Sequence, residues 1–289
     1  MSQQDSPAKR QKTVLITGCS TGIGYCVAMG LHDRGYQVFA TARKLADVEK
    51  LKQQGLNTLL LDLDDSQSIR NCVAQILAQT DGHIDVLFNN GAYGQPGAVE
   101  DLRRDVLKAQ LETNLLGTME LTNLVIPAMR QHGFGRIIQN SSVLGLISLP
   151  FRGAYNTSKY ALEGLSDTLR LELHGTGIYV SLIEPGPIES QFRKNALSAY
   201  QKNIDSDKSV HRETYIRLYQ RLTKTGPAAP FTLPPHAVLE KVIHAIESPR
   251  PKARYYVTFP TYLFATLKRI MPHRALDWIL LRVSKNENK

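Results

Sequence analysis

Short apolar segments alternate with amphipathic helical segments along most of this chain, and this alternation is what most restricts its fold. A short apolar run between turn residues is typical of a strand buried on both faces of a parallel sheet. The expected strands are residues 13–17, 36–41, 57–61, 84–88, 136–140, 179–183 and 255–259. The expected helices are residues 25–34, 45–54, 66–79, 102–131, 155–173, 210–223 and 234–247. This order predicts one α/β domain, a doubly wound parallel sheet of seven strands with helices on both faces.

A glycine-rich turn joins the first expected strand to the first expected helix. Gly18, Gly22 and Gly24 occupy this turn. Glycines let a backbone approach a pyrophosphate closely, and the N-terminus of a helix supplies free N–H groups and the positive end of the helix dipole. The turn therefore predicts a dinucleotide phosphate site, because the strand and the helix that such a site needs are both in place.

Tyr155 and Lys159 lie one turn apart in the expected helix 155–173, so the phenol and the ammonium group share one helix face. A nearby cation favours a phenolate, which predicts a pKa for Tyr155 closer to neutrality than the usual value of about 10. Such a phenol can donate and accept the proton in carbonyl–alcohol chemistry. The pair alone is a weak signal, since a Tyr and a Lys at this spacing occur by chance in many helices.

Further residues accompany this pair in a fixed order along the chain. They are Thr17, Gly18, Gly22, Gly24, Asp62, Asn89, Asn90, Gly91, Asn114, Ser142, Pro185 and Gly186. In these residues and in the spacing of Ser142 from Tyr155, the sequence resembles the short-chain dehydrogenase/reductase family. Within that family it is similar to members with extended C-terminal tails, namely retinol and 17β-hydroxysteroid dehydrogenases and bacterial NADP-dependent aldehyde reductases. The resemblance covers nearly the whole chain and implies a single-domain Rossmann-type fold.

One departure from the family pattern is Gly91-Ala92, where the family usually has Ala-Gly. Both residues are small, so a tight turn is still expected at this position.

The resemblance implies four catalytic residues. Tyr155 would give its proton to the carbonyl oxygen as hydride arrives from the nicotinamide, and Lys159 would favour the phenolate and bind the nicotinamide ribose. Ser142, selected over Ser141 by the family spacing alone, would hydrogen-bond the substrate oxygen. Asn114 would hold a water that relays protons to Lys159. Two alternatives stay open: Ser142 could cap a local turn, and Asn114 could be a core amide satisfied within the protein.

The end of the second expected strand bears on the choice of coenzyme. NAD-dependent relatives carry an acid where Ala42 stands, and none is present here. Arg43 follows, and a guanidinium group is well shaped to pair with a phosphate, so NADP(H) is the expected coenzyme. Alternatively, Arg43 and Lys44 are solvated residues that open the next helix. The resemblance implies further coenzyme contacts from Gly18, Ser20, Thr21, Gly22, Ile23, Gly24, Lys44, Asp62, Leu63, Asn89, Asn90, Gly91, Tyr155, Lys159, Pro185, Gly186 and Ile188.

Residues 187–235 interrupt the strand–helix pattern, and in this family such a stretch covers the substrate as a lid. Its apolar and aromatic residues either suit a lipophilic carbonyl compound or bury the stretch against the core. These residues are Phe192, Tyr200, Tyr215, Leu218 and Tyr219.

The expected function is the NADP(H)-dependent interconversion of an aldehyde or ketone and the corresponding alcohol. The substrate is expected to be a small lipophilic molecule. Steroid or retinol dehydrogenation and reduction of an acyl-dihydroxyacetone phosphate are alternative reactions. A binding protein that senses NADP(H) without catalysis is the alternative outside enzymes.

Charge and cysteine content narrow the partners of the chain. Its net charge of +9 is spread over amphipathic helices without a nucleic-acid-binding motif, so we expect no nucleic-acid partner. The three cysteines form no ligand cluster, so no metal site is expected, and they suit a reducing compartment such as the cytoplasm. The sequence leaves open whether the protein is a homo-oligomer, either a dimer or a tetramer.

The two ends of the chain differ from its centre. Residues 1–12 are polar and are typical of a short disordered arm, and residues 13–260 are expected to form the catalytic domain. Residues 261–289 are expected to form an amphipathic, basic helical tail. The uncharged run of residues 255–267 is too short to span a membrane, which takes about 20 residues. The tail either makes peripheral contact with a membrane surface or packs over the substrate cleft or a partner subunit.

Overall fold

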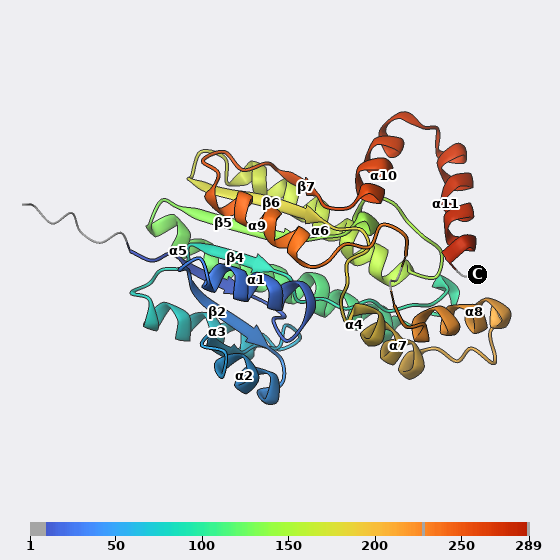
Figure 1. Ribbon diagram of the computed structural model, residues 1–289, viewed down its shortest axis with the longest axis horizontal. Helices are drawn as coiled ribbons and strands as arrows, with labels where there is room; N and C mark the ends of the chain where they lie inside the picture. The colour runs from blue at the N-terminus through green and yellow to red at the C-terminus, as the bar shows by residue number, and fades with distance from the viewer. Residues whose placement is uncertain (1–9, 227–228, 288–289) are drawn as a thin grey trace, which may run out of the picture.

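A computed structural model describes residues 10–226 and 229–287, and it confirms the expected α/β architecture (Figure 1). All seven strands are parallel and lie in the order β3-β2-β1-β4-β5-β6-β7. Their bounds are β1 Thr13–Ile16, β2 Gln37–Ala42, β3 Asn57–Leu60, β4 Val86–Asn89, β5 Gly135–Asn140, β6 Ile178–Glu184 and β7 Arg254–Tyr256. The strand order reverses between β1 and β4, and doubly wound sheets bind their ligands beyond the carboxyl ends of the strands at such a point.

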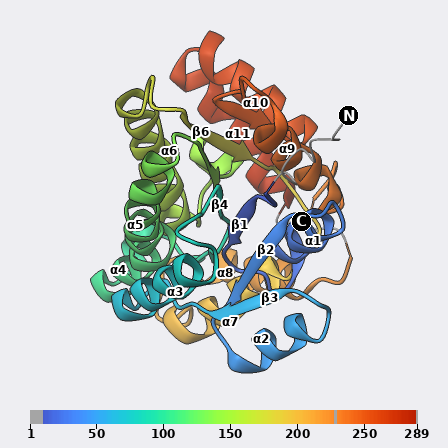
Figure 2. The same cartoon turned by 90° about the vertical axis from the view of Figure 1, so that its left-hand side faces the viewer.

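Helices cover both faces of the sheet (Figure 2). One layer consists of α1 Gly22–His32, α2 Leu45–Lys52 and α9 His236–Glu247, and the other of α3 Ser66–Gln79, α5 Gly117–Gln131 and α6 Gly153–Glu172. Successive side chains of a strand point to opposite faces, so each layer has its own hydrophobic core. Val14 and Ile16 of β1 are buried in the first core, and Leu15 between them is buried in the second.

The expected helical region over residues 102–131 is present, but it begins at Arg104 and is not α-helical throughout. The segment contains α4 Arg104–Leu111, a π-helical turn Glu112–Leu116 and then α5. Asn114 lies in this turn and bonds to groups outside the helix, and a side chain at Gly117 would collide with the carbonyl oxygen of Leu63. Such π-helical turns are frequent at functional sites.

Most of the helices that follow β6 lie at the carboxyl ends of the strands (Figure 1). The expected helix 210–223 is present as α8 Arg212–Thr223, but α7 Phe192–Asn203 was not expected. Only Ala196 and Tyr200 of α7 are buried, and two buried positions are too few to show an apolar period in the sequence. The expected strand 255–259 is shorter, because α10 Phe259–Ile270 already begins there, with Pro260 in its first turn.

The C-terminal helices α10 and α11, the latter His273–Glu287, cover the segment after β5. Phe264, Leu276 and Leu280 are buried against three apolar residues of that segment, Leu144, Ile147 and Leu149. The inner face of the tail is therefore part of the protein core.

We expect Leu280→Ala to lower the free energy of unfolding by about 2 kcal/mol or more, because it removes buried methyl groups and leaves a cavity. Leu281→Ala is the matched control, since Leu281 is 52% exposed and Leu280 is 7% exposed. The control should change the free energy of unfolding by less than about 0.5 kcal/mol. Equal effects in urea denaturation would show that the tail is not packed as described.

The N-terminal segment is held on the sheet from residue 10 onward. Arg10 Nη2 lies 2.6 Å from Asp85 Oδ1, and the carbonyl oxygen of Lys12 accepts a hydrogen bond from the backbone N–H of Gln37. The expected disordered arm thus does not include residues 10–12, and its residues 1–9 lie outside the described residues.

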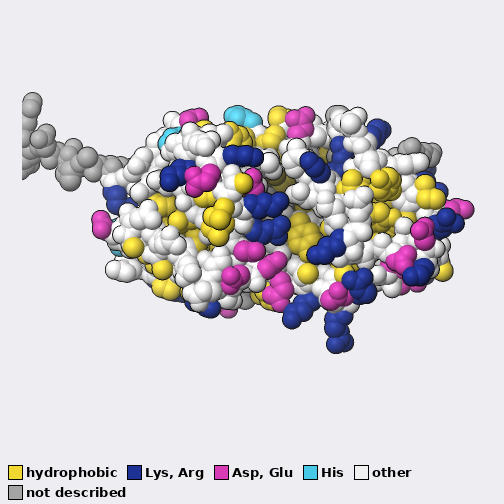
Figure 3. All heavy atoms as spheres, turned by 90° about the horizontal axis from the view of Figure 1, so that it is seen from below, with side chains coloured by type: hydrophobic (Ala, Val, Ile, Leu, Met, Phe, Trp, Pro, Cys, Tyr) yellow, Lys and Arg dark blue, Asp and Glu magenta, His cyan; other side chains and the backbone are white. Residues whose placement is uncertain are grey.

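Within the described ranges, no helix is both long and apolar enough to cross a membrane. On the face shown in Figure 3, Lys and Arg side chains are intermixed with Asp and Glu.

Candidate active site

The glycine-rich turn forms a cradle that has no room for side chains. Gly18 and Gly22 have φ angles of +70° and +60°, which favour glycine. A Cβ atom at Gly24 would lie 2.3 Å from the carbonyl oxygen of Gly18. Asn90 Nδ2 donates to the carbonyl oxygens of Thr17 and Gly18 at 3.0 and 3.2 Å. The turn between β1 and α1 is thereby fastened to the end of β4.

The cradle opens at the N-terminus of α1. Ser20 and Thr21 are exposed, and the side chain of Thr21, the N-cap residue, makes no capping hydrogen bond. A helix N-terminus of this kind suits an anionic phosphate. The first residues of the expected lid lie close by, since a Cβ at Gly22 would be 3.1 Å from Ser190 Cβ. These features fit the pyrophosphate of a dinucleotide.

Of the other expected coenzyme contacts, Arg43 and Lys44 directly follow β2 and are exposed. The pKa of Tyr93 is raised, first by burial and then by the charge of Asp64, and the positive charge of Arg43 opposes this rise, so Arg43 lies near Tyr93. Asp62 Oδ1 accepts the backbone N–H of Asp64 at 3.1 Å and so shapes the turn after β3.

Three further residues of the expected coenzyme set, Leu63, Asn89 and Gly91, make contacts within the protein. Leu63 lies under Gly91, with its Cδ1 atom 3.2 Å from where a Cβ of Gly91 would be. Asn89 Nδ2 donates to Thr122 Oγ1 at 2.9 Å, so its side chain holds α5. Contact of these residues with a coenzyme stays a prediction.

Lys159 is buried beside the carboxyl end of β5. Its Nζ donates to the backbone oxygen of Asn140 at 2.7 Å and lies 5.7 Å from the centroid of the Tyr155 ring. Phe192, from the start of α7, covers Tyr155 from the other side with its ring edge-on at 5.2 Å between centroids. Tyr155 of α6 is therefore in contact with the lid and is half-buried.

Of the two neighbouring serines, Ser142 and not Ser141 meets Tyr155. Ser142 hydrogen-bonds the side chain of Tyr155, while Ser141 Oγ is buried without a partner among the described groups. Ser142 Oγ also accepts the backbone N–H of Leu144 at 3.1 Å, so it caps the short turn after β5 as the local alternative expected. The local interpretation of Ser142 is confirmed, and its hydrogen bond to a substrate oxygen stays a prediction.

Burial is the largest influence on the pKa values of Tyr155 and Lys159. It raises the pKa of Tyr155 to about 12, although the hydrogen bond from Ser142 and the charge of Arg152 oppose it. It lowers the pKa of Lys159 to about 8, against the opposing charge of Glu163. The expected shift of the Tyr155 pKa toward neutrality is therefore wrong, because loss of solvent outweighs the nearby cation. At neutral pH the phenol keeps its proton.

Asn114 connects the π-helical turn to α6. Its Oδ1 accepts the N–H of Tyr93 at 3.1 Å, and its Nδ2 donates to the Tyr93 carbonyl oxygen at 2.9 Å and to Ser158 Oγ at 3.1 Å. These are the contacts expected of a core amide. Ser158 directly precedes Lys159, so Asn114 helps to position α6, and the water relay stays a prediction.

The loop after β6 closes the site. The backbone oxygen of Pro185 accepts the N–H of Val143, and a Cβ at Gly186 would lie 2.1 Å from Thr258 Oγ1. Ile188 forms a bridge with Leu233, so the two ends of the expected lid are joined.

Some of the aromatic and apolar lid residues are buried within the protein, and one of them faces Tyr155. Tyr200, Tyr215 and Leu218 are buried together and form the lid's own core. Phe192 faces Tyr155, and Tyr219 is partly exposed.

Sequence reasoning missed a buried group of charges next to Lys159, formed by Glu163, Asp167, Glu184 and Arg254. One signal was available: Glu163 is an acid one turn beyond Lys159, on the buried face of its helix.

A doubly wound sheet with a glycine cradle at its switch point, beside a buried serine and lysine and a half-buried tyrosine, is typical of a dinucleotide-dependent oxidoreductase. Comparison with known proteins makes the family plain, because the sequence pattern of the short chain dehydrogenases matches residues 12–201. The chain belongs to the short-chain dehydrogenase/reductase family.

Two relatives and one solved structure illustrate the similarity. The chain is 44% identical over 270 residues, 93% of this chain and 94% of the relative, to the uncharacterized oxidoreductase YbbO of Escherichia coli K12. It is 34% identical over 258 residues, 85% of this chain and 77% of the relative, to human 17-beta-hydroxysteroid dehydrogenase type 1. Actinorhodin polyketide ketoreductase with NADPH superposes with a TM-score of 0.70 at 28% identity, covering 86% of this chain and 95% of that one.

Proposed function

We propose that this oxidoreductase interconverts a lipophilic aldehyde or ketone and its alcohol with NADP(H) as coenzyme. One observation carries the proposal: the Ser142 hydroxyl, the Tyr155 phenol and Lys159 come together beyond the carboxyl ends of the strands, beside the glycine cradle. The coenzyme, when bound, supplies or accepts the hydride.

The protein's own residues handle the substrate oxygen and its proton. Tyr155 is protonated at neutral pH and donates its proton to the carbonyl oxygen during reduction. Ser142 hydrogen-bonds the same oxygen, and this bond strengthens as negative charge develops there. Lys159, anchored on the Asn140 carbonyl, stabilises the phenolate that remains. Oxidation of the alcohol uses the same groups in reverse.

The preference for NADP(H) rests on the residues after β2. Ala42 leaves no acid there, and Arg43 is exposed beside the cradle, where a guanidinium can pair with the 2′-phosphate. The similar ketoreductase structure contains NADPH, which supports the same choice for this chain.

A lipophilic substrate is supported by the surroundings of Tyr155. Phe192 packs on its ring, and a buried apolar cluster that includes Leu144 and Leu276 lies against it. Steroid and retinol oxidation stay as alternatives, as does reduction of an acyl-dihydroxyacetone phosphate.

The test follows NADPH absorbance with medium-chain aldehydes, retinal, steroid ketones and acyl-dihydroxyacetone phosphate. Oxidation of NADPH by one of these classes supports the enzyme and names its substrate class. Tight NADPH binding without turnover of any class would favour the sensing alternative.

The outer face of the tail supports a further proposal, peripheral contact of a cytoplasmic protein with a membrane. Trp278 is 62% exposed on α11, and Leu281 lies one turn on, at 52%. Arg274 and Arg282 are exposed on the same helix, and Arg282 lies over the Trp278 ring. Apolar residues among basic ones suit the interface of an anionic bilayer.

We expect the full chain to co-sediment with anionic vesicles at low salt and Trp278→Ser/Leu281→Ser to lose most of this binding, because the apolar anchor is gone. Val210→Ser is the matched control, since Val210 is 86% exposed on the lid. Failure of the unchanged protein to bind would refute membrane contact. Light scattering on the same preparation measures whether the protein is a dimer or a tetramer.

A further inference from the structure

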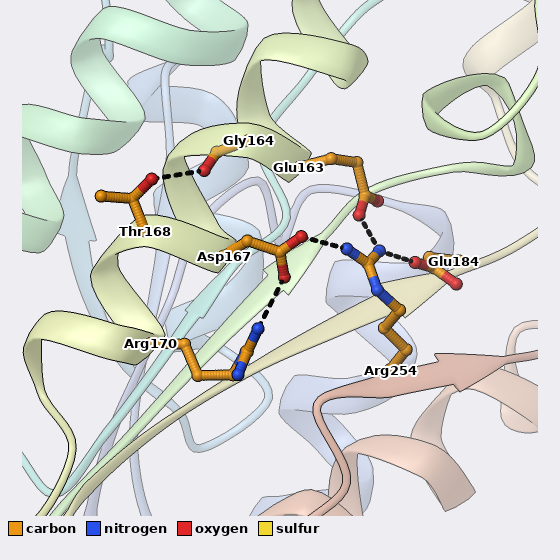
Figure 4. Close-up of polar contacts among 7 residues, drawn as sticks. All are labelled: Glu163, Gly164, Asp167, Thr168, Arg170, Glu184 and Arg254. Atoms are coloured by element: carbon orange, nitrogen blue, oxygen red, sulfur yellow. Dashed lines mark hydrogen bonds and ion pairs between the residues drawn. The ribbon is translucent and has the colours of Figure 1, made fainter.

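Four charged residues form a compact cluster behind the active site, which we name the Arg254 cluster: Glu163, Asp167, Glu184 and Arg254 (Figure 4). Arg254, at the start of β7, points its guanidinium group between the three carboxyl groups. Its Nη1 lies 2.6 Å from Glu184 Oε1 and also bonds Glu163 Oε2, and its Nη2 lies 2.5 Å from Asp167 Oδ2. Three carboxyl groups thus share one guanidinium.

Two of these carboxyl groups lie in the core and next to each other. Glu184 is fully buried and Glu163 is 6% exposed. Both bind the same nitrogen of Arg254, so their carboxyl groups are adjacent. Glu163 Oε1 and Glu184 Oε2 are buried and accept no hydrogen bond from another described group. Two buried carboxyl groups at this separation cannot both ionise without a large cost, and one proton between them removes the repulsion and satisfies an orphaned oxygen.

Helix α6 connects the Arg254 cluster to Lys159. Glu163 follows Lys159 by one helical turn, so both side chains lie on the same buried face. The charge of Glu163 acts on Lys159 and raises its pKa, in opposition to burial. Glu163 also packs against the turn that follows Ser142, since a Cβ at Gly145 would lie 3.0 Å from Glu163 Cγ.

We propose that Glu163 and Glu184 hold one shared proton and that their remaining single negative charge keeps Lys159 protonated in its buried position. Both are positioning residues, because they act through Lys159 and do not contact the reacting atoms. With one proton on the pair, the charges of the pair and Asp167 balance those of Arg254 and Lys159. The importance of this charge for turnover rests on the proposed function, while the charge of Lys159 can be measured without it.

Among the described residues, the titratable or charged groups that face the pair come from two elements, α6 and β7. Lys159 and Asp167 come from α6 itself, and Arg254 and Tyr256 come from β7. The pKa of Tyr256 is raised, chiefly by burial and then by the charge of Glu184, so this phenol stays neutral and supplies no competing charge.

The first experiment measures the titration of Lys159 by NMR of lysine labelled with ¹³C at Cε, with the resonance assigned from Lys159→Arg. In the wild type it should titrate near pH 8. Glu163→Gln should lower this midpoint by roughly one pH unit, because the negative charge of the pair then lies on Glu184 and no longer on Glu163, the carboxyl group that acts on Lys159. Asp167→Asn is the matched control: Asp167 binds the same guanidinium but lies two turns from Lys159 and is 39% exposed. Its midpoint should stay at the wild-type value.

The second experiment measures stability against pH and does not depend on Glu163→Gln being able to fold. The pKa of Glu184 is raised to about 8, first by burial and then by the charge of Glu163, whereas an unfolded Glu titrates near its model value of 4.5. Between these values the folded protein holds a proton that the unfolded chain has lost. The unfolding equilibrium constant should therefore rise by up to about tenfold per pH unit from pH 5 to 8, and Glu184→Gln should remove this contribution.

The outcomes separate the two proposals. A Lys159 midpoint that Glu163→Gln leaves unchanged, or that Asp167→Asn moves equally, overturns the role of the pair. A pH dependence of stability that survives in Glu184→Gln overturns the shared proton. Absence of NADPH oxidation in the wild type would instead overturn the proposed function and leave both titrations valid.

Discussion

Tyr155→Phe is expected to lower kcat for carbonyl reduction by roughly 10²-fold or more while NADPH affinity stays nearly unchanged. The substitution keeps the ring that packs against Phe192 and removes only the proton that the reaction needs. The pKa of Tyr155, about 12, leaves the phenol protonated throughout the neutral range, so the loss should be equally large at pH 6 and pH 8. Steady-state kinetics and a separate NADPH titration measure the two quantities.

Tyr160→Phe is the matched control for this variant. Tyr160 lies on the same helix, but its hydroxyl bonds to the carbonyl oxygen of Leu146. The control should retain turnover within about twofold, because its hydroxyl has no proton to supply to the site. Near-full turnover in Tyr155→Phe would show that another group protonates the substrate oxygen.

Arg43→Ala is expected to weaken NADPH binding by roughly ten- to a hundredfold and to leave NADH binding nearly unchanged. A charge-assisted contact to a phosphate contributes on the order of 1.5–3 kcal/mol, and only NADPH carries the 2′-phosphate. Calorimetric titration of both coenzymes into both proteins measures the difference.

Lys50→Ala provides the matched loss of one positive charge. Lys50 is exposed on α2, the helix that follows Arg43, and belongs to no expected coenzyme contact. It should change the binding of either coenzyme by less than about twofold, since an isolated surface charge is screened by salt. If Arg43→Ala weakened NADH and NADPH binding equally, Arg43 would act on the fold and would not bind the phosphate.

Sequence reasoning worked best where the signal is local. The strand–turn–helix pattern around Gly18 and Gly22 depends on backbone conformations that only glycine adopts easily, so the cradle was recognisable from residue type and spacing. The pairing of Tyr155 with Lys159 follows from the helical period. The sequence did not predict α7, because this helix buries only two residues. It also did not predict the π-helical turn within the helical region 102–131.

The tail shows why some alternatives could not be separated from sequence. An apolar stripe with basic residues suits both a membrane surface and a closing helix. In the structure Leu280 faces the core and Leu281 faces solvent, so adjacent leucines serve different surfaces. Only the position of Leu144 and its neighbours, far away in the sequence, determines which face is buried.

The sequence by itself determined the class of fold, the phosphate cradle and the spacing of Tyr155 and Lys159, because each depends on residues close together in the chain. Tertiary structure decided that Ser142 and not Ser141 meets the phenol, and that burial is the largest influence on the pKa of Tyr155. It also brought Glu163, Glu184 and Arg254 into one buried cluster. Desolvation and charge pairing depend on which distant segments exclude water from a group, and no local pattern in the chain encodes that arrangement.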